Sequence, residues 1–327
     1  MTPSMRSQGK IADKFTRSVS SEKGSRVNLL FIDSDQKAKY QALLSVSSLP
    51  DLQITPNISE ANIILADPPA IADKLEQATS LVWLQSTYAG CDALIEQNKR
   101  DYRLSNVRGI FGALISEYVL GQLLNMTRHF SVYKEQQQHK QWQPHAYRSL
   151  NGQRILILGT GSIGRQLAVV ARQFGMKVSG VSRSGTQLPA FDHVFDTSSL
   201  GNALADTDIV VSTLPSTPST ISLLDADTLS HCRQVILFNV GRGNVLCEEG
   251  LKIALTKGQI SHAFLDVFEQ EPLADDHWCW QHPDVTVTPH IAAVSFPEQV
   301  AECFRQNYLS WHQEDKLLTE IDFSRGY

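Results

Sequence analysis

Three short segments in the last third of the chain combine residue types that could reduce a carbonyl group. They carry Arg242 (in residues 239–243), Glu271 (in 266–272) and His290 (in 287–290). A guanidinium grips a planar carboxylate through paired hydrogen bonds, and a histidine can donate a proton to a carbonyl oxygen. A glutamate hydrogen-bonded to that imidazole keeps it charged and oriented. Together these groups suit the reduction of a 2-keto acid.

Each of the three segments directly follows an apolar run that predicts a β-strand. The runs are residues 235–238, 263–265 and 285–287. In an open parallel sheet the carboxyl ends of the strands border one crevice, where ligands bind. Taken singly, Arg242 would be a surface charge, Glu271 a loop acid and His290 an ordinary polar side chain. Their ordered occurrence after strands favours a catalytic site, with Glu271 preferred over Glu269, which we expect to be exposed.

A second signal lies upstream, where the apolar residues 155–158 lead into Gly159-Thr160-Gly161-Ser162-Ile163-Gly164. Apolar residues then repeat at helical spacing until Gly175, which stands at a C-cap position. The first glycine of such a turn permits a tight bend, the second lets a pyrophosphate approach, and the third lets helix and strand pack closely. The free N–H groups of the helix start, which includes Ser162 and Ile163, would face the phosphates. The context favours a dinucleotide site over a purely structural turn.

The residues after the next expected strand, 177–181, address the choice of cofactor. They are Ser182, Arg183 and Ser184, with no carboxylate nearby. Sites specific for NAD hold the ribose 2′-hydroxyl with an acidic residue about 20 residues past the glycine turn. Arg183 can instead bind a 2′-phosphate, and the serines can donate hydrogen bonds. The sequence favours NADP(H); the alternative is a solvated Arg183 and equal use of NAD(H).

From Val27 to its end the chain resembles the D-isomer-specific 2-hydroxyacid dehydrogenases. Besides the segments above, residues 214–220 (Leu-Pro-Ser-Thr-Pro-Ser-Thr) resemble the family's Leu-Pro-x-Thr-Pro-x-Thr loop. The resemblance implies hydride transfer from NADPH to a small 2-keto acid, with Arg242, Glu271 and His290 as catalytic residues. Within the family, residues 182–184, the Trp278/Trp280 pair and the terminal residues 325–327 look most like the NADPH-dependent glyoxylate/hydroxypyruvate reductase branch.

The resemblance also implies contacts around these residues. Leu214, Pro215, Asn239, Val240, Gly241 and Asp266 would line the cofactor site, with Asp266 near the nicotinamide carboxamide. The backbone N–H groups of Tyr88, Ala89 and Gly90 would bind the substrate carboxylate together with Arg242. The plainer alternatives are a strand-end aspartate at 266 and a βα turn with Gly90 in a left-handed conformation. Residues 292–295 replace a more Gly- and Thr-rich family segment, which leaves the preferred substrate open.

Strand and helix signals alternate from Val27 onward and predict an α/β fold. Strands are expected at 27–32, 52–54, 62–65, 81–84 and 102–107, helices at 36–44 and 71–78, and a long helix-forming stretch at 113–138. The glycine turn comes late, and the 37 residues after His290 are too few for a domain. We therefore expect a flavodoxin-like substrate-binding (catalytic) domain of residues 27–110 and 290–327, interrupted by an NAD(P)-binding Rossmann domain of residues 111–289.

Composition excludes other classes of function. A net charge of −5 and a pI near 6.1 give no basic surface for nucleic acid or anionic membranes. No apolar run approaches the roughly 18 residues of a membrane helix. The five cysteines lack paired spacing, which predicts reduced thiols in a cytoplasmic protein without a metal site. The polar, basic, Ser-rich residues 1–26 are expected to form a flexible tail, with a transit peptide as the alternative.

Assembly and two other functions complete the expectations. The resemblance implies a homodimer formed through the cofactor domains and the stretch after Ala113, whose Leu114, Val119, Leu120, Leu123 and Leu124 exceed one buried face. A phosphoglycerate-type dehydrogenase of the same family and a non-enzymatic, dinucleotide-sensing scaffold stay open as alternatives. Formate dehydrogenases of this scaffold pair the histidine with glutamine, so Glu271 argues against them.

Overall fold

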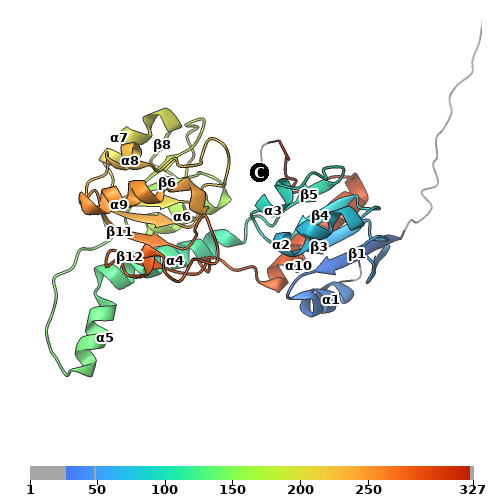
Figure 1. Cartoon of the computed structure of the whole chain (residues 1–327), viewed down its shortest axis with the longest axis horizontal. Helices are drawn as coiled ribbons and strands as arrows, with labels where there is room; N and C mark the ends of the chain where they lie inside the picture. The colour runs from blue at the N-terminus through green and yellow to red at the C-terminus, as the bar shows by residue number, and fades with distance from the viewer. Residues whose placement is uncertain (1–26, 48, 325–327) are drawn as a thin grey trace, which may run out of the picture.

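The computed structural model describes residues 27–47 and 49–324, which form two lobes (Figure 1). The small lobe is built on a five-stranded sheet and the large lobe on a seven-stranded sheet, and every strand pair in both is parallel. The predicted α/β fold with two parallel sheets is confirmed. The predicted tail at 1–26 and the motif at 325–327 lie outside the described residues.

The small lobe has the strand order β2-β1-β3-β4-β5, which is the order of flavodoxin-like sheets. Its strands are β1 (Asn28–Asp33), β2 (Leu52–Ile54), β3 (Ile63–Ala66), β4 (Trp83–Ser86) and β5 (Arg103–Ser105). Its helices are α1 (Lys37–Ser45), α2 (Pro68–Ile71), η1 (Ala72–Gln77), α3 (Asp92–Ile95) and α10 (Pro297–Glu314). All residues of β3 and β4 are buried, as expected of central strands covered on both faces.

The last helix returns the chain to this lobe. The rings of Trp83 in β4 and Phe304 in α10 stack with centroids 5.2 Å apart. Asn307 of α10 donates a hydrogen bond to Gln85 of β4 (2.7 Å). The segment after His290 therefore completes the core of the small lobe, whereas the domain boundaries at 110/111 and 289/290 stay predictions.

The large lobe has the strand order β12-β11-β10-β9-β6-β7-β8. Counted from β6, this is the Rossmann order with one further strand at the edge, and the order reverses between β6 and β9. The strands are β6 (Arg154–Leu158), β7 (Lys177–Val181), β8 (His193–Phe195), β9 (Ile209–Ser212), β10 (Val235–Asn239), β11 (Ile260–Leu265) and β12 (Val285–Val287). The helices are α4 (Phe111–Thr127), α5 (Phe130–Gln138), α6 (Ser162–Gln173), η2 (Thr197–Ser199), α7 (Leu200–Ala205), α8 (Ala226–Leu229), η3 (Gly243–Val245), α9 (Glu248–Thr256) and η4 (Trp278–Trp280).

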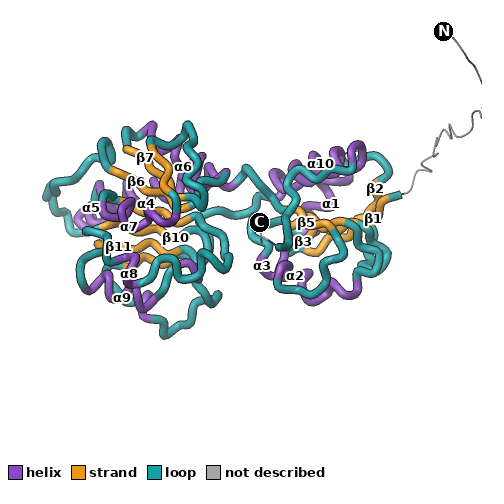
Figure 2. Tube along the Cα trace, turned by 90° about the horizontal axis from the view of Figure 1, so that it is seen from above, coloured by secondary structure: helices purple, strands orange, loops and turns teal. Residues whose placement is uncertain are grey.

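Helices cover both faces of this sheet (Figure 2). Residues of α7, α8 and α9 form one hydrophobic cluster with the sheet, and residues of α4 and α6 form the other. α6 follows the amphipathic repeat that the sequence shows, and Gly175 just beyond it has φ +75°, as a left-handed C-cap requires. None of the helices in the described parts of the chain combines the length and the apolarity that crossing a bilayer takes.

Two features of the large lobe differ from the sequence-based expectation. The expected helical stretch 113–138 is two helices, because His129 at φ +60° breaks the hydrogen-bonding pattern between α4 and α5. α5 then projects away from the body of the lobe (Figure 1). The strands β8 and β9 had no prediction, although β9 is an apolar, fully buried run of four residues.

Candidate active site

The glycine turn lies at the switch point of the large sheet, between β6 and α6. Gly159 has φ +100° and Gly161 is the N-cap of α6. A Cβ atom on Gly164 would lie 2.0 Å from the carbonyl oxygen of Gly159, whereas one on Gly161 would have no atom within 4 Å. Gly164 therefore permits the close approach of helix and turn, and Gly161 leaves the N-terminus of α6 open. This open cradle fits a pyrophosphate at a helix N-terminus.

The neighbouring strands bring their loops to the same edge. β7 and β9 flank β6, so residues 182–184 and 214–215 lie beside the glycine turn. Thr213 links the loops by donating to the carbonyl of Leu158 (3.0 Å). Arg183 is exposed and has no ion pair within the described residues. The predicted cofactor residues are therefore gathered along one edge, with a free guanidinium beside β7.

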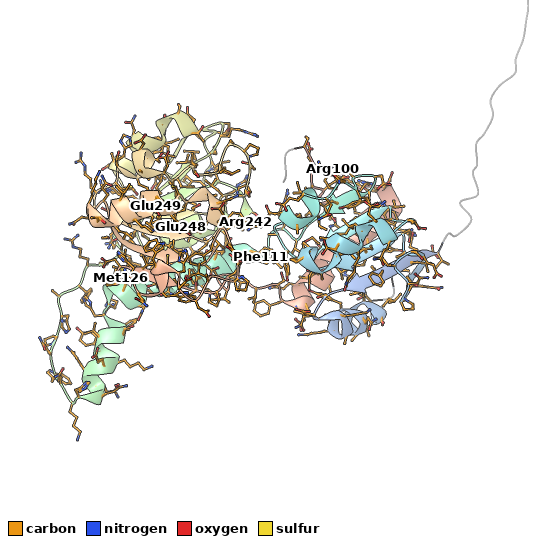
Figure 3. The ribbon with its side chains drawn as sticks, viewed as in Figure 1. Arg100, Phe111, Met126, Arg242, Glu248 and Glu249 are labelled. Carbon is orange, nitrogen blue, oxygen red and sulfur yellow. The ribbon has the colours of Figure 1, made fainter. Side chains whose placement is uncertain are left out.

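Arg242 follows β10 and reaches across to the small lobe (Figure 3). Its Nε donates to Asp92 Oδ2 (2.8 Å) and its Nη1 to the carbonyl of Gly241 (2.7 Å). The Nε bond is also an ion pair between the lobes. Asn239, fully buried, holds the turn by donating to the Arg242 carbonyl (3.0 Å). Nη2 forms no hydrogen bond within the described parts of the chain.

The Arg242 guanidinium packs directly against Gly90. A Cβ atom at Gly90 would lie 1.3 Å from Arg242 Nη2, so any larger residue would displace the arginine. The left-handed conformation that the sequence suggested for Gly90 is wrong, because Gly90 is not among the glycines with positive φ. The glycine is needed for the close approach of a side chain 152 residues later in the chain, which local sequence cannot reveal.

The turn around Gly90 offers backbone donors to an anion. The N–H of Tyr88 already donates to Ser86 Oγ (2.9 Å). Within the described residues the N–H groups of Ala89 and Gly90 have no acceptor, and Asn106 fixes the turn by donating to the Ala89 carbonyl (2.6 Å). Two N–H groups beside the Arg242 guanidinium form a cradle for a carboxylate. The predicted N–H contact of Tyr88 stays a prediction, while its side chain lines the cleft described below.

His290 and Glu271 form a pair on the large-lobe side. His290 Nδ1 lies 2.7 Å from Glu271 Oε2, and the other carboxylate oxygen accepts the N–H of Phe268 (2.9 Å). An ionised carboxylate can only accept, so Nδ1 carries the hydrogen. Nε2 has no partner within the described residues, and His290 lines the cleft. Glu269, as expected, is exposed.

Asp266 organises the loop that carries His290. It is 1% exposed and accepts bonds from Thr288 Oγ1 (2.6 Å) and from the N–H groups of Ile291 (2.9 Å) and Ala292 (2.9 Å). The Tyr118 hydroxyl lies 2.7 Å from Thr288 Oγ1. Because Thr288 donates its one hydrogen to Asp266, Tyr118 must be the donor to Thr288. Burial raises the pKa of Tyr118 to about 12, so it stays protonated.

This network connects the loop that carries His290 to the middle of α4. Sequence reasoning missed Tyr118, Thr288 and Asp92. Thr288 belongs to the predicted segment 287–290. Tyr118 and Asp92 lie far from their partners in the chain and follow no sequence pattern. The predicted contact of Asp266 with a nicotinamide carboxamide stays a prediction.

Residues of both lobes line a single cleft of about 510 Å³. The large lobe and the crossing segment contribute Ile163, Val240, Arg242, Asp266, His290, Ala293, Val294 and Ser295, and the start of α4 contributes Phe111 and Ile115. The small lobe contributes Ser34, Asp35, Gln36, Tyr40, Asp67, Tyr88, Ala89 and Gly90. Arg242 is the one arginine or lysine among these lining residues. The three predicted catalytic regions and the substrate turn thus meet around one space.

Known proteins are similar to this chain in sequence and fold. The model of the D-isomer specific 2-hydroxyacid dehydrogenase NAD binding domain matches residues 120–292. Glyoxylate/hydroxypyruvate reductase A of Yersinia enterocolitica is 32% identical over 266 residues, covering 77% of this chain and 84% of its own length. A D-isomer specific 2-hydroxyacid dehydrogenase family protein from Aeromonas salmonicida is 45% identical, with a TM-score of 0.87 over 91% of this chain and 99% of that chain.

A further solved structure carries ligands. It is a probable 2-hydroxyacid dehydrogenase from Rhizobium etli in complex with NADP, HEPES and L(+)-tartaric acid. It is 26% identical, with a TM-score of 0.79, and the match covers 92% of this chain and all of that chain (100%). The family match spans the glycine turn, Arg242, Glu271 and His290, so the resemblance inferred from the sequence is confirmed. The chain belongs to the D-isomer-specific 2-hydroxyacid dehydrogenases, a family of NAD(P)-binding oxidoreductases that act on CH–OH groups.

Proposed function

We propose that the protein reduces a small 2-keto acid, such as glyoxylate or hydroxypyruvate, with NADPH. The observation that carries this proposal is the meeting of Arg242, the Glu271–His290 pair and the Ala89–Gly90 turn around one cleft. Bound nicotinamide supplies the hydride, and the protein supplies orientation, anion recognition and a proton. The Yersinia enterocolitica relative is named for the reduction of these two acids.

Arg242 and the Ala89–Gly90 turn hold the substrate carboxylate. Asp92 and the Gly241 carbonyl fix the guanidinium through Nε and Nη1, so Nη2 presents its hydrogens in a set direction. The N–H groups of Ala89 and Gly90 add two neutral donors. A planar guanidinium suits this position better than an ammonium does, because it can be held at Nε and Nη1 while Nη2 faces the carboxylate.

His290 delivers the proton to the carbonyl oxygen from Nε2. Its ring orientation is set at Nδ1 by Glu271, whose carboxylate also offsets the positive charge of the protonated ring. The backbone of His290 is held in turn by its N–H bond to the Asp266 carbonyl (2.9 Å). Alcohol formation then needs only the hydride on the carbonyl carbon and this proton on the oxygen.

For the cofactor we infer NADP(H) over NAD(H). The large lobe binds NAD(P), as the family does. Arg183 and the hydroxyls of Ser182 and Ser184 stand beside the glycine turn with no carboxylate among them, which suits a 2′-phosphate. The Rhizobium etli structure contains NADP, which supports the same choice.

A substrate panel tests the function. NADPH oxidation is followed with glyoxylate, hydroxypyruvate, pyruvate and 3-phosphohydroxypyruvate. We expect the highest kcat/KM with glyoxylate or hydroxypyruvate, and a lower value with NADH in place of NADPH. A preference for 3-phosphohydroxypyruvate would support the phosphoglycerate-type alternative, and lack of turnover with every acid would refute the proposal.

We further infer that the protein is a homodimer. α5 and the segment that follows it project from the large lobe and expose Phe130, Val132, Trp142 and Tyr147. Val119, Leu120 and Leu123 of α4 are buried within the chain itself, so the projecting arm, more than α4, supports a partner. Light scattering should give a dimer, and Phe130→Glu with Trp142→Glu should shift it to a monomer. A monomeric unmodified protein would refute the inference.

The cellular compartment that we propose is the cytoplasm. All five cysteines are unpaired in the structure, as expected of thiols in a reducing compartment. Fractionation of cells that produce the protein tests this, and recovery outside the cytoplasm would contradict it.

A further inference from the structure

The small-lobe end of the cleft is polar and negatively charged. It is formed by Asp35 between β1 and α1, Tyr40 of α1, Asp67 at the start of α2 and the side chain of Tyr88. The neighbouring lining from the start of α4, Phe111 and Ile115, is apolar. None of the reaction steps above uses Asp35, Tyr40 or Asp67.

The Tyr40 hydroxyl is accessible from the cleft and has no hydrogen-bond partner among the described residues. The residue is 1% exposed and lines the cleft, yet within the described residues its hydroxyl forms no hydrogen bond. The hydroxyl oxygen is not one of the fully buried polar atoms that lack a partner, so its hydrogen-bonding capacity is open to a ligand in the cleft. Burial, and next the charge of Asp67, raises the pKa of the Tyr40 hydroxyl. The hydroxyl therefore stays neutral and able to donate as well as accept.

The two carboxylates at this end have no counter-ion. Asp67 is 8% exposed and accepts bonds from the Thr87 hydroxyl and from the N–H of Asp35 (3.1 Å). Within the described residues, no lysine or arginine forms an ion pair with Asp67 or Asp35. Asp33, two residues before Asp35, is paired with Lys74 (2.7 Å) and does not line the cleft. Asp67, which is buried, and Asp35, which is exposed, therefore give this end of the cleft a negative charge.

This end adjoins the proposed carboxylate cradle. Thr87, the partner of Asp67, is separated from Ala89 by a single residue, and burial followed by the charges of Asp67 and Asp35 raises the pKa of the Tyr88 hydroxyl. A 2-keto acid held by its carboxylate at Ala89–Gly90 and by its carbonyl at His290 has one remaining substituent, the group attached to its carbonyl carbon. The small-lobe end is the polar surface left to receive it.

We propose that Tyr40, Asp67 and Asp35 form the subsite for this substituent and select uncharged, hydroxylated substituents over anionic ones. A hydroxyl can donate to a carboxylate and pair with the Tyr40 hydroxyl, whereas a second carboxylate or a phosphate is repelled. The proposal rests on the proposed function and deepens it, because it names the residues and the charge rule that set the substrate class.

The test compares kcat/KM for four acids with the full-length protein and NADPH. Glyoxylate lacks the substituent and serves as the reference, pyruvate carries a methyl group, hydroxypyruvate a hydroxymethyl group and oxaloacetate a carboxymethyl group. In the unmodified protein, oxaloacetate should fall at least about tenfold below hydroxypyruvate, as like charges meet in a partly desolvated site.

Tyr40→Phe tests hydrogen bonding to a hydroxyl substituent, and Asp35→Asn tests the repulsion of an anionic substituent. Loss of one hydrogen bond should lower the hydroxypyruvate-to-pyruvate ratio about fivefold to tenfold in Tyr40→Phe. The Tm of this variant should stay the same, because the removed hydroxyl forms no hydrogen bond within the described residues. Asp35→Asn should raise the oxaloacetate-to-glyoxylate ratio about fivefold to tenfold, since one of two repelling charges is removed.

Asp33→Asn is the matched control, because it removes a nearby carboxylate that faces Lys74 and should leave both ratios unchanged. Ratios that stay constant in Tyr40→Phe and Asp35→Asn while glyoxylate is turned over would overturn the subsite and keep the proposed function. A lower Tm of Tyr40→Phe with an unchanged ratio would show a structural role and equally overturn it. Lack of glyoxylate and hydroxypyruvate turnover in the unmodified protein would refute the function and the subsite with it.

Discussion

In each lobe, the loop between the first strand of the sheet and the helix that follows it lies at the switch point. The two loops differ in their glycine content and in their charge. In the large lobe β6 leads into the glycine turn, with an open helix N-terminus and no carboxylate. In the small lobe β1 leads into Asp33-Ser34-Asp35-Gln36, which has no glycine and two carboxylates. Both sheets have orders in which ligands bind at such a point. Loop composition, and not the sheet, therefore decides which edge holds the dinucleotide.

The largest effect is expected for His290, which lines the cleft between the two lobes. His290→Ala should lower kcat for keto-acid reduction at least about a hundredfold, because the proton donor is lost. NADPH affinity should change little, since the glycine turn and the residues beside it are intact. Stopped-flow turnover and fluorescence titration of NADPH measure the two quantities, and His193→Ala, on the exposed edge strand β8, is the control. Near-normal turnover of the His290 variant would remove this residue from the mechanism.

Gly161→Ala tests the glycine turn itself. The added methyl group meets no protein atom within 4 Å, so Tm should be unchanged. It would, however, occupy the approach of the pyrophosphate, and loss of charge-assisted bonds should weaken NADPH binding about a hundredfold. Gly164→Ala, whose Cβ would lie 2.0 Å from the Gly159 carbonyl oxygen, should lower Tm as well. Unimpaired NADPH binding by Gly161→Ala would place the dinucleotide elsewhere.

Arg183→Ala tests the cofactor choice at the loop after β7, beside the glycine turn. Loss of a charged hydrogen bond to the 2′-phosphate should weaken NADPH binding about tenfold to a hundredfold. NADH binding should barely change, and Ser182→Asp should move the preference further toward NADH. Equal Kd values for NADPH and NADH in the unmodified protein would contradict the assignment of Arg183.

Arg242→Lys tests the contact that Arg242 makes between the large lobe and the small lobe. The charge stays, but the planar fork and the bond to Asp92 are lost, so kcat/KM should fall about tenfold with little change in NADPH affinity. Arg233→Lys, an exposed arginine at the opposite end of β10, is the matched control. An unaltered kcat/KM would reduce Arg242 to a structural link between the lobes.

The smallest effect is expected at the opposite, amino end of the large sheet. The hydrogen bonds from Arg154 hold the pKa of Asp208 below its ordinary value. A lowered folded-state pKa stabilises the protein above the unfolded value and loses this contribution as pH falls through the folded one. Asp208→Asn should therefore lower Tm slightly at neutral pH, and the difference should shrink below about pH 4. Thermal unfolding across pH measures it; a difference that is constant with pH would contradict the ion pair.

The contrast between the two edges also explains what the sequence could predict. The glycine turn, Arg242, Glu271 and His290 follow strands in short contiguous motifs, so their types and spacing announce the chemistry. The small-lobe end depends on Tyr40 and Asp67, which come from separate elements without a shared pattern. The same holds for contacts such as Tyr118 with Thr288 and Arg242 with Gly90, whose partners are brought together only by the fold.

The most direct test of the division between the two edges is a crystal structure with NADPH and oxamate, a non-reducible analogue of a 2-keto acid. The account predicts the pyrophosphate at the N-terminus of α6, the 2′-phosphate beside Arg183, and the oxamate carboxylate between Arg242 and the N–H groups of Ala89 and Gly90. Oxamate bound away from Arg242, or a dinucleotide phosphate at the acidic loop after β1, would contradict it.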